Sequence, residues 1–146
     1  EDIILKTSRL CNVEYLLGRN INSLSGGELK RVQLAKTLVQ LYNPSPNKRE
    51  NKYALLDEPL ANLDLFYEIE VLKIIRRVSR DQGIGIMLII HDLNLAAKFS
   101  NEIALLHSGE IKDYGKPKDV LRPSILKTIY RMNMKVQKNP FRVIHY

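Results

Sequence analysis

Tyr53-Ala54-Leu55-Leu56-Asp57-Glu58-Pro59 is the stretch on which the fold depends. A continuous apolar run is typical of a buried strand in a parallel sheet, because helices cover both faces of such a sheet. Ligands of open parallel sheets bind beyond the carboxyl ends of the strands, so Asp57 and Glu58 are expected where a ligand is met. Successive strand residues point to opposite faces, so one carboxylate can hold a metal ion while the other takes a proton. A solvated strand end before a turn is the alternative for this stretch taken alone.

A second apolar run, residues 86–90, ends in His91-Asp92. It predicts a second strand that delivers a titratable group to the same edge of the sheet, although a histidine at this place can also be structural. Between the two strands, Asp64 is expected to cap a helix that ends at Gln82-Gly83-Ile84-Gly85. The apolar residues of this helix recur at three-residue spacing: Ile69, Leu72, Ile75 and Val78.

Leu24-Ser25-Gly26-Gly27-Glu28 is the second informative stretch. A serine and two glycines ahead of a helix place a hydroxyl and backbone N–H groups at the positive end of the helix dipole. This predicts an anion site, with an ordinary helix N-cap as the alternative. The helix that follows is expected to bury its apolar residues and expose its basic ones: Val32, Ala35, Leu38 and Val39 inside, and Lys30, Arg31 and Lys36 largely outside.

The rest of the chain predicts smaller elements. The expected elements are a helical face of Leu10, Val13, Leu16 and Leu17 ended by Gly18, a surface loop with a mobile tip at 42–52, a helix at 93–99, a hairpin at 102–111 turning at Ser108-Gly109, helical stretches at 119–121 and 124–132, and a strand at 142–145.

Composition favours one soluble globular domain, since 45% of the 146 residues are hydrophobic and 27% are charged. The longest apolar run, residues 86–90, is far shorter than the roughly 18 residues of a membrane span, so we expect no transmembrane segment. The one cysteine, Cys11, excludes an intrachain disulfide. The net charge of +7 is spread along the chain, which favours a solvated basic surface over a nucleic-acid or membrane site.

Taken together, these motifs closely resemble those of the ATP-binding-cassette (ABC) ATPases. Residues 24–28 are similar to the signature motif, 55–59 to the Walker B strand with its catalytic carboxylate, 60–64 to the D-loop, and His91 to the switch histidine. The order and the spacing of all four agree with the family. The resemblance implies an α/β fold like that of the P-loop NTPases, with a mostly parallel sheet flanked by helices and part of a helical subdomain at the N-terminus.

The resemblance also implies a role for each matching residue. Asp57 would hold Mg²⁺ and Glu58 would polarise the water that attacks the γ-phosphate of ATP, with His91 contacting that phosphate. Asp64 would link the site to a facing subunit. The signature residues would close in trans on ATP held by that subunit in a head-to-tail dimer: Leu24, Ser25, Gly26, Gly27 and Glu28.

The phosphate-cradling loop of the family is missing from these residues. The loop requires Gly, four residues, then Gly-Lys-Ser/Thr, and no stretch of the chain has this form. The family's Q-loop glutamine also has no counterpart ahead of Leu24. The chain opens at Glu1-Asp2-Ile3 without methionine or signal peptide. We therefore expect an incomplete domain, with a helical and signature region at 1–42 and the sheet core and tail at 53–146, that is inactive alone.

The resemblance further implies membrane-permease partners and a cytoplasmic location on the inner face of the membrane, with no nucleic-acid partner. Several stretches resemble those of the importers of iron-siderophores, haem and cobalamin. They are the loop before Tyr53, Leu63-Asp64-Leu65, 109–111, 115–117, 119–121 and 124–136. Two alternatives stay open. One is a soluble ABC-type ATPase acting on nucleic acid, and the other is a non-catalytic remnant that only dimerises.

Overall fold

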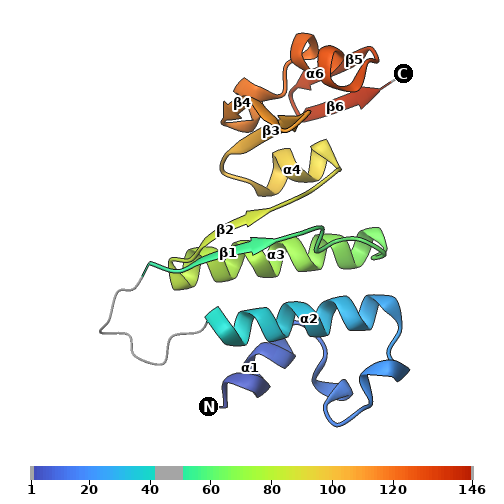
Figure 1. Ribbon diagram of the computed structural model, residues 1–146, viewed down its shortest axis with the longest axis vertical. Coiled ribbons are helices and arrows are strands. Elements are labelled where there is room, and N and C mark those ends of the chain that lie inside the picture. Colours follow the sequence, from blue (N-terminus) through green and yellow to red (C-terminus); the bar gives the residue numbers. More distant parts are fainter. Residues whose placement is uncertain (1, 42–50, 146) are drawn as a thin grey trace. The chain divides into compact units, whose positions relative to one another are not determined.

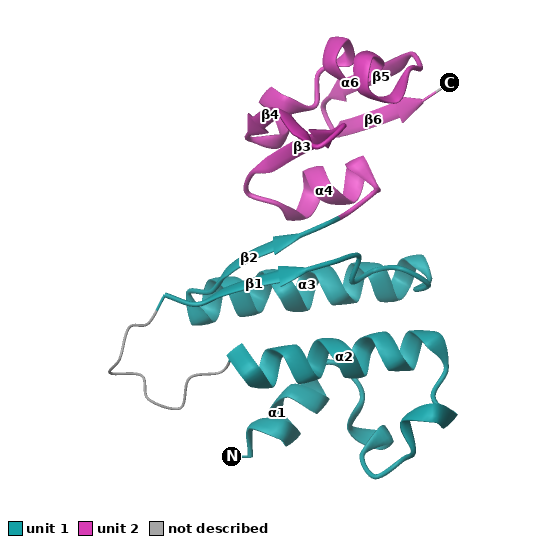
Figure 2. Ribbon diagram, in the orientation of Figure 1, with its two compact units in different colours: residues 1–89 teal, residues 90–146 magenta. Residues whose placement is uncertain are grey.

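The computed structural model describes residues 2–41 and 51–145 (Figure 1). They form two compact units, one of residues 1–89 and one of residues 90–146 (Figure 2). This boundary differs from the division at 42 and 53 expected from the motifs, because the first unit also contains the first two strands. The predicted loop at 42–52 lies mostly outside the described residues.

The first unit is mainly helical. Its elements are α1 (Ile3–Leu10), the 3₁₀ helices η1 (Glu14–Leu16) and η2 (Ile21–Ser23), α2 (Gly26–Leu41), β1 (Tyr53–Leu56), α3 (Leu65–Gln82) and β2 (Gly85–Leu88). The second unit combines short helices with two hairpins. Its elements are α4 (Leu93–Phe99), β3 (Ile103–His107), β4 (Glu110–Gly115), α5 (Pro117–Val120), α6 (Pro123–Tyr130), β5 (Met134–Lys138) and β6 (Phe141–His145).

The start of the chain corrects one prediction. A single helical face was expected to continue to Leu17, but α1 ends at Leu10. The chain reverses at Asn12, whose φ of 53° is in the left-handed region, and a separate 3₁₀ turn follows. The apolar side chains at and after this break are still buried, with Cys11 1% and Leu16 5% exposed. The spacing therefore predicts two buried residues correctly, Val13 and Leu16, whereas Leu17 is 48% exposed and the continuous helix is wrong.

Strands β1 and β2 pair in parallel, with Tyr53 opposite Gly85 and Leu55 opposite Met87. This confirms the predicted parallel strands, but their expected burial on both faces is wrong. Tyr53 is 75%, Leu55 70% and Met87 62% exposed, and the alternate residues of both strands are half-buried. The reason is that α3 packs on this two-stranded sheet from one side (Figure 1).

Helix α3 begins and ends as predicted. The Asp64 side chain accepts the backbone N–H of Tyr67 at 3.0 Å, which satisfies a donor of the first turn. Gly83 ends the helix with a φ of 65°, a left-handed conformation that glycine adopts without steric cost. Leu72 and Ile75 are buried, as their spacing indicates.

The second unit contains the predicted hairpin. Ser108 and Gly109 join β3 to β4 with φ values of 53° and 77°, the positive pair that a two-residue turn needs. Its strands are antiparallel, as are β5 and β6, so within the described residues the parallel pairing is limited to β1 and β2. The buried core of this unit consists of Ile103, Leu105, Val120, Leu121, Leu126 and Val143.

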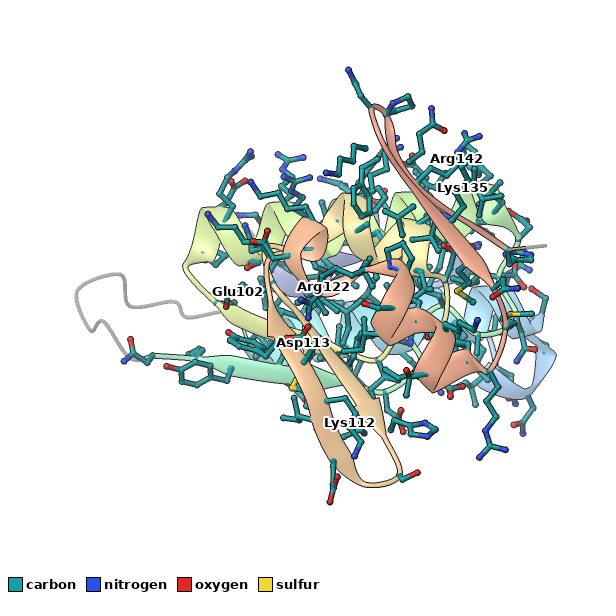
Figure 3. The ribbon with its side chains drawn as sticks, turned by 90° about the horizontal axis from the view of Figure 1, so that it is seen from above. Glu102, Lys112, Asp113, Arg122, Lys135 and Arg142 are labelled. Carbon is teal, nitrogen blue, oxygen red and sulfur yellow. The ribbon has the colours of Figure 1, made fainter. Side chains whose placement is uncertain are left out.

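The C-terminal part adds a strand that the sequence did not indicate. Helices α5 and α6 and strand β6 match the predicted stretches, whereas β5 was not expected. Arg122, which precedes α6, forms an ion pair of 2.6 Å with Asp113 of β4 (Figure 3). Lys135 and Arg142 lie together on the β5–β6 hairpin (Figure 3). Among the described residues, no helix combines the length and the apolar character that crossing a membrane requires.

Candidate functional site

The start of α2 is held by a reciprocal pair of hydrogen bonds. The backbone N–H of Ser25 donates to Glu28 Oε2 at 2.8 Å, and the backbone N–H of Glu28 donates to Ser25 Oγ at 3.3 Å. This is a capping box, in which a serine and a glutamate three residues later satisfy two orphan donors of the first turn. The hydrogen bond from Ser25 also lowers the pKa of Glu28 below its ordinary value.

The capping box is compatible with anion binding. Ser25 Oγ accepts the bond from Glu28, so its own hydroxyl proton can still be donated to a ligand. Gly26 and Gly27 open the helix, where backbone N–H groups have no intrahelical acceptor and the dipole favours negative charge. Leu24 adopts extended backbone just before this turn. The N-cap alternative is thus present, and it leaves the donors of an anion site in place.

The segment after β1 is a pair of tight turns. Ala61 N–H donates to the Glu58 carbonyl at 3.2 Å and Leu63 N–H donates to the Leu60 carbonyl at 3.1 Å. Glu58 has a φ of 44°, a conformation that non-glycine residues rarely adopt. Asp57 and Glu58 are both exposed at the end of β1. The expectation that they continue the alternation of the strand is wrong, since the extended backbone stops before Glu58.

A recess of about 510 Å³ lies within the first unit, between the start of α2 and the start of α3. It brings together four of the predicted site residues: Ser25, Gly27, Glu28 and Asp64. Leu63 also lines the recess, and its side chain would lie 3.5 Å from a Cβ placed on Gly27. Two segments that are far apart in the sequence therefore form one polar surface.

Arg31 lies in this recess, although it was expected to be largely outside. Only 7% of the residue is exposed. Its guanidinium carbon lies 4.2 Å from the centre of the Tyr67 ring, a cation–π contact, and its Nη2 donates to the Tyr15 hydroxyl at 3.3 Å. Two aromatic residues thus supply the surroundings that allow this arginine to be buried.

No family model matches the chain. It is 42% identical over 135 residues to the hemin import ATP-binding protein HmuV of Burkholderia thailandensis, covering 92% of this chain and 50% of that protein. The corresponding protein of Escherichia coli O157:H7 is 37% identical over 131 residues, with 90% and 50% covered. The chain spans about half the length of the curated relatives it matches.

Solved structures of ABC transporter proteins share the fold of this chain. An inward-facing structure described as a metal-chelate type ABC transporter superposes with a TM-score of 0.81 at 22% identity, over 99% of this chain and 56% of that chain. A component of an ABC transporter complex from Clostridium perfringens has a TM-score of 0.64 at 26% identity, with 80% and 43% covered. The chain is therefore similar to the ABC ATPases in sequence and in fold. It matches about half of such a protein.

The remaining predicted residue, His91, lies in the second unit, where it is exposed just before α4. Its neighbour Asp92 caps α4 by accepting the N–H groups of Asn94 at 2.7 Å and Leu95 at 2.9 Å. Asp57, Glu58 and the recess residues belong to the first unit. The structure therefore groups residues from the stretches 24–28 and 60–64, and describes His91 with its own unit.

Sequence reasoning missed three residues of the recess: Tyr15, Arg31 and Tyr67. One signal pointed to Arg31. The buried apolar residues of α2 are Leu34, Ala35 and Leu38, and the same helical face extended one turn back falls on position 31. The tyrosines carried no such signal, because their roles depend on contacts between separate elements.

Proposed function

We propose that this chain is part of an ATP-binding and ATP-hydrolysing subunit that energises a membrane importer. The observation that carries the proposal is the recess in which Ser25, Gly27 and Glu28 lie with Asp64. It joins an anion-binding helix start to the turn that follows the carboxylate pair. Relatives named as hemin import ATP-binding proteins support the same assignment.

In this proposal the signature residues bind ATP held by a facing ATPase subunit. The Ser25 hydroxyl and the N–H groups of Gly26 and Gly27 would donate hydrogen bonds to the γ-phosphate oxygens. Leu24 and Glu28 would flank the turn, and Glu28 would hold its shape through the bonds to Ser25. Asp64, at the other end of the recess, would contact the facing subunit.

Asp57 and Glu58 would carry the chemistry. Mg²⁺ in nucleotide sites is held by one or two carboxylates together with phosphate oxygens and water, and Asp57 suits this role because its carboxylate is exposed beyond the end of β1. Bound Mg²⁺ would neutralise charge on the phosphates. Glu58 would orient the attacking water and accept its proton. Its left-handed backbone supports a functional role, since such conformations cluster at active sites.

His91 would position the same water and contact the γ-phosphate. Imidazole is suited to this task because it can donate from one ring nitrogen and accept at the other. We place the subunit in the cytoplasm, on the inner face of the membrane, where permease subunits would hold it. The imported class would be haem or a related metal chelate, a siderophore or cobalamin.

A transport assay tests the proposal. A complete domain would be built by joining the phosphate-loop portion of a hemin import ATP-binding protein to residues 1–146, and assembled with its permease in vesicles. We expect ATP hydrolysis that drives uptake of haem, and we expect Glu58→Gln to abolish both. Hydrolysis without uptake of haem, siderophore or cobalamin would contradict the importer, and stimulation by DNA would favour a nucleic-acid ATPase. A folded chimaera without hydrolysis would favour a non-catalytic remnant.

A further inference from the structure

Arg31 is a buried cation whose position has an energetic cost. It is 7% exposed, and its Nε atom has no hydrogen-bond partner among the described residues. Removing a charged group from water is unfavourable unless its surroundings compensate for the lost hydration. Buried charged residues can often be replaced by apolar residues of similar volume without loss of stability. The position of Arg31 therefore suggests a role other than stability.

On one side, Arg31 is connected to the signature turn. Its Nη2 donates to the Tyr15 hydroxyl at 3.3 Å, and that hydroxyl donates to Glu28 Oε1 at 3.1 Å. The other carboxylate oxygen of Glu28 accepts the backbone N–H of Ser25 at 2.8 Å. The guanidinium is thus linked through two side chains to the backbone of Ser25.

On the other side, Arg31 is connected to the start of α3. Its guanidinium carbon lies 4.2 Å from the centre of the Tyr67 ring. The backbone N–H of Tyr67 donates to the Asp64 side chain at 3.0 Å. Arg31 therefore stands between two helix caps, that of α2 at Ser25 and that of α3 at Asp64, each of which lines the recess.

We propose that Arg31 is a positioning residue that sets the signature turn relative to the D-loop. It would act through Tyr15 and Glu28 on Ser25, and through Tyr67 on Asp64, without touching nucleotide itself. This inference rests on the proposed ATPase function. Ser25 and Asp64 would both contact the facing subunit. A small displacement of one relative to the other would therefore misalign the groups that hydrolyse ATP.

The test compares Arg31→Met with Lys36→Met in a complete ATPase domain that carries these residues. Methionine keeps much of the volume of arginine and removes the charge, and Lys36 is an exposed residue of the same helix. We expect Arg31→Met to unfold no more easily than the parent, while kcat falls about 10- to 100-fold, the effect of a small misplacement, and KM for ATP changes little. Lys36→Met should match the parent in both respects.

A stable Arg31→Met variant with the kcat of the parent would overturn the proposal. If Arg31→Met does not fold, Tyr15→Phe tests the proposal in its place. This variant should fold, because it removes only one hydroxyl from a residue that is 58% exposed. We expect Tyr15→Phe to lower kcat several-fold. A kcat equal to that of the parent would overturn the proposal. Glu58→Gln in the same domain tests the ATPase function separately. If it retains full hydrolysis, the proposed function is wrong, whatever Arg31 does.

Discussion

Glu28 Oε2 accepts the backbone N–H of Ser25 at 2.8 Å, and Ser25 Oγ accepts the backbone N–H of Glu28 at 3.3 Å. These two hydrogen bonds fix the turn at residues 25–28. In the proposed function this turn would meet a phosphate with its donors already oriented, which would lower the entropic cost of binding.

The pKa of Glu28 makes this turn sensitive to acid. The hydrogen bond from the Ser25 backbone N–H lowers the pKa of Glu28 below its ordinary value of 4.5. The folded state thus keeps the carboxylate ionised to lower pH than the unfolded chain, and the resulting stabilisation is present above pH 4.5 and is lost as pH falls through the folded pKa. Urea unfolding between pH 6 and pH 3 should show a pH-dependent component that Glu28→Gln removes.

Glu68→Gln is the matched control, since Glu68 lies in the first turn of α3. It should keep the pH-dependent component of the parent. Equal pH profiles for Glu28→Gln and the parent would show that the capping carboxylate does not act as described.

Cys11 should react slowly with thiol reagents in the folded chain. It is 1% exposed, and burial raises its pKa from 9.0 to about 12, against a smaller opposing effect of Arg31. The thiolate is the reactive form, so roughly a thousandfold less of it is present below pH 9 than in the unfolded chain. Because the folded pKa is raised, the free energy of unfolding should fall as pH rises above 9. Labelling at equal rates with and without denaturant would contradict the buried position.

The 146-residue chain should self-associate through its exposed sheet face. Tyr53, Leu55 and Met87 lie together on the β1–β2 pair and are each at least 62% exposed. Apolar patches of this kind promote association. Leu55→Lys should shift light scattering towards a monomer. A parent chain that stays monomeric over a wide concentration range would contradict this prediction.

The same chain should bind Mg-ATP weakly. Phosphate affinity in P-loop proteins depends on a nest of backbone N–H groups and a lysine, and these residues contain no Gly-x₄-Gly-Lys-Ser/Thr stretch. Calorimetric titration should show no micromolar binding. Micromolar affinity would mean that the nucleotide site lies elsewhere.

Local chemistry made part of the structure predictable from the sequence. The Asp64 cap, the stop at Gly83 and the turn at Ser108-Gly109 depend on residues within a few positions of each other. The resemblance of residues 24–28 and 55–59 to the signature and Walker B motifs could be seen for the same reason, because order and spacing are read along the chain.

The remaining features depend on contacts between distant segments. Arg31 carries a polar side chain, so its burial follows from Tyr15 and Tyr67 and not from its own type. The exposure of Leu55 depends on which elements pack against the sheet. The contact of Asn94 could not be predicted for the same reason. Its side chain accepts the N–H of Val143 at 2.8 Å and donates to the Val143 carbonyl at 3.1 Å, across 49 residues of sequence.

Single-turnover hydrolysis, together with a measurement of dimer state, tests most directly whether Glu58 activates water for ATP hydrolysis. In a complete domain carrying these residues, Glu58→Gln keeps the shape of the side chain and removes its basicity. Hydrolysis should slow by about 100- to 10,000-fold while the dimer stays closed on ATP. Asp57→Asn should instead weaken Mg-ATP binding and give no stabilised dimer. Hydrolysis by Glu58→Gln at near the parent rate would contradict the account.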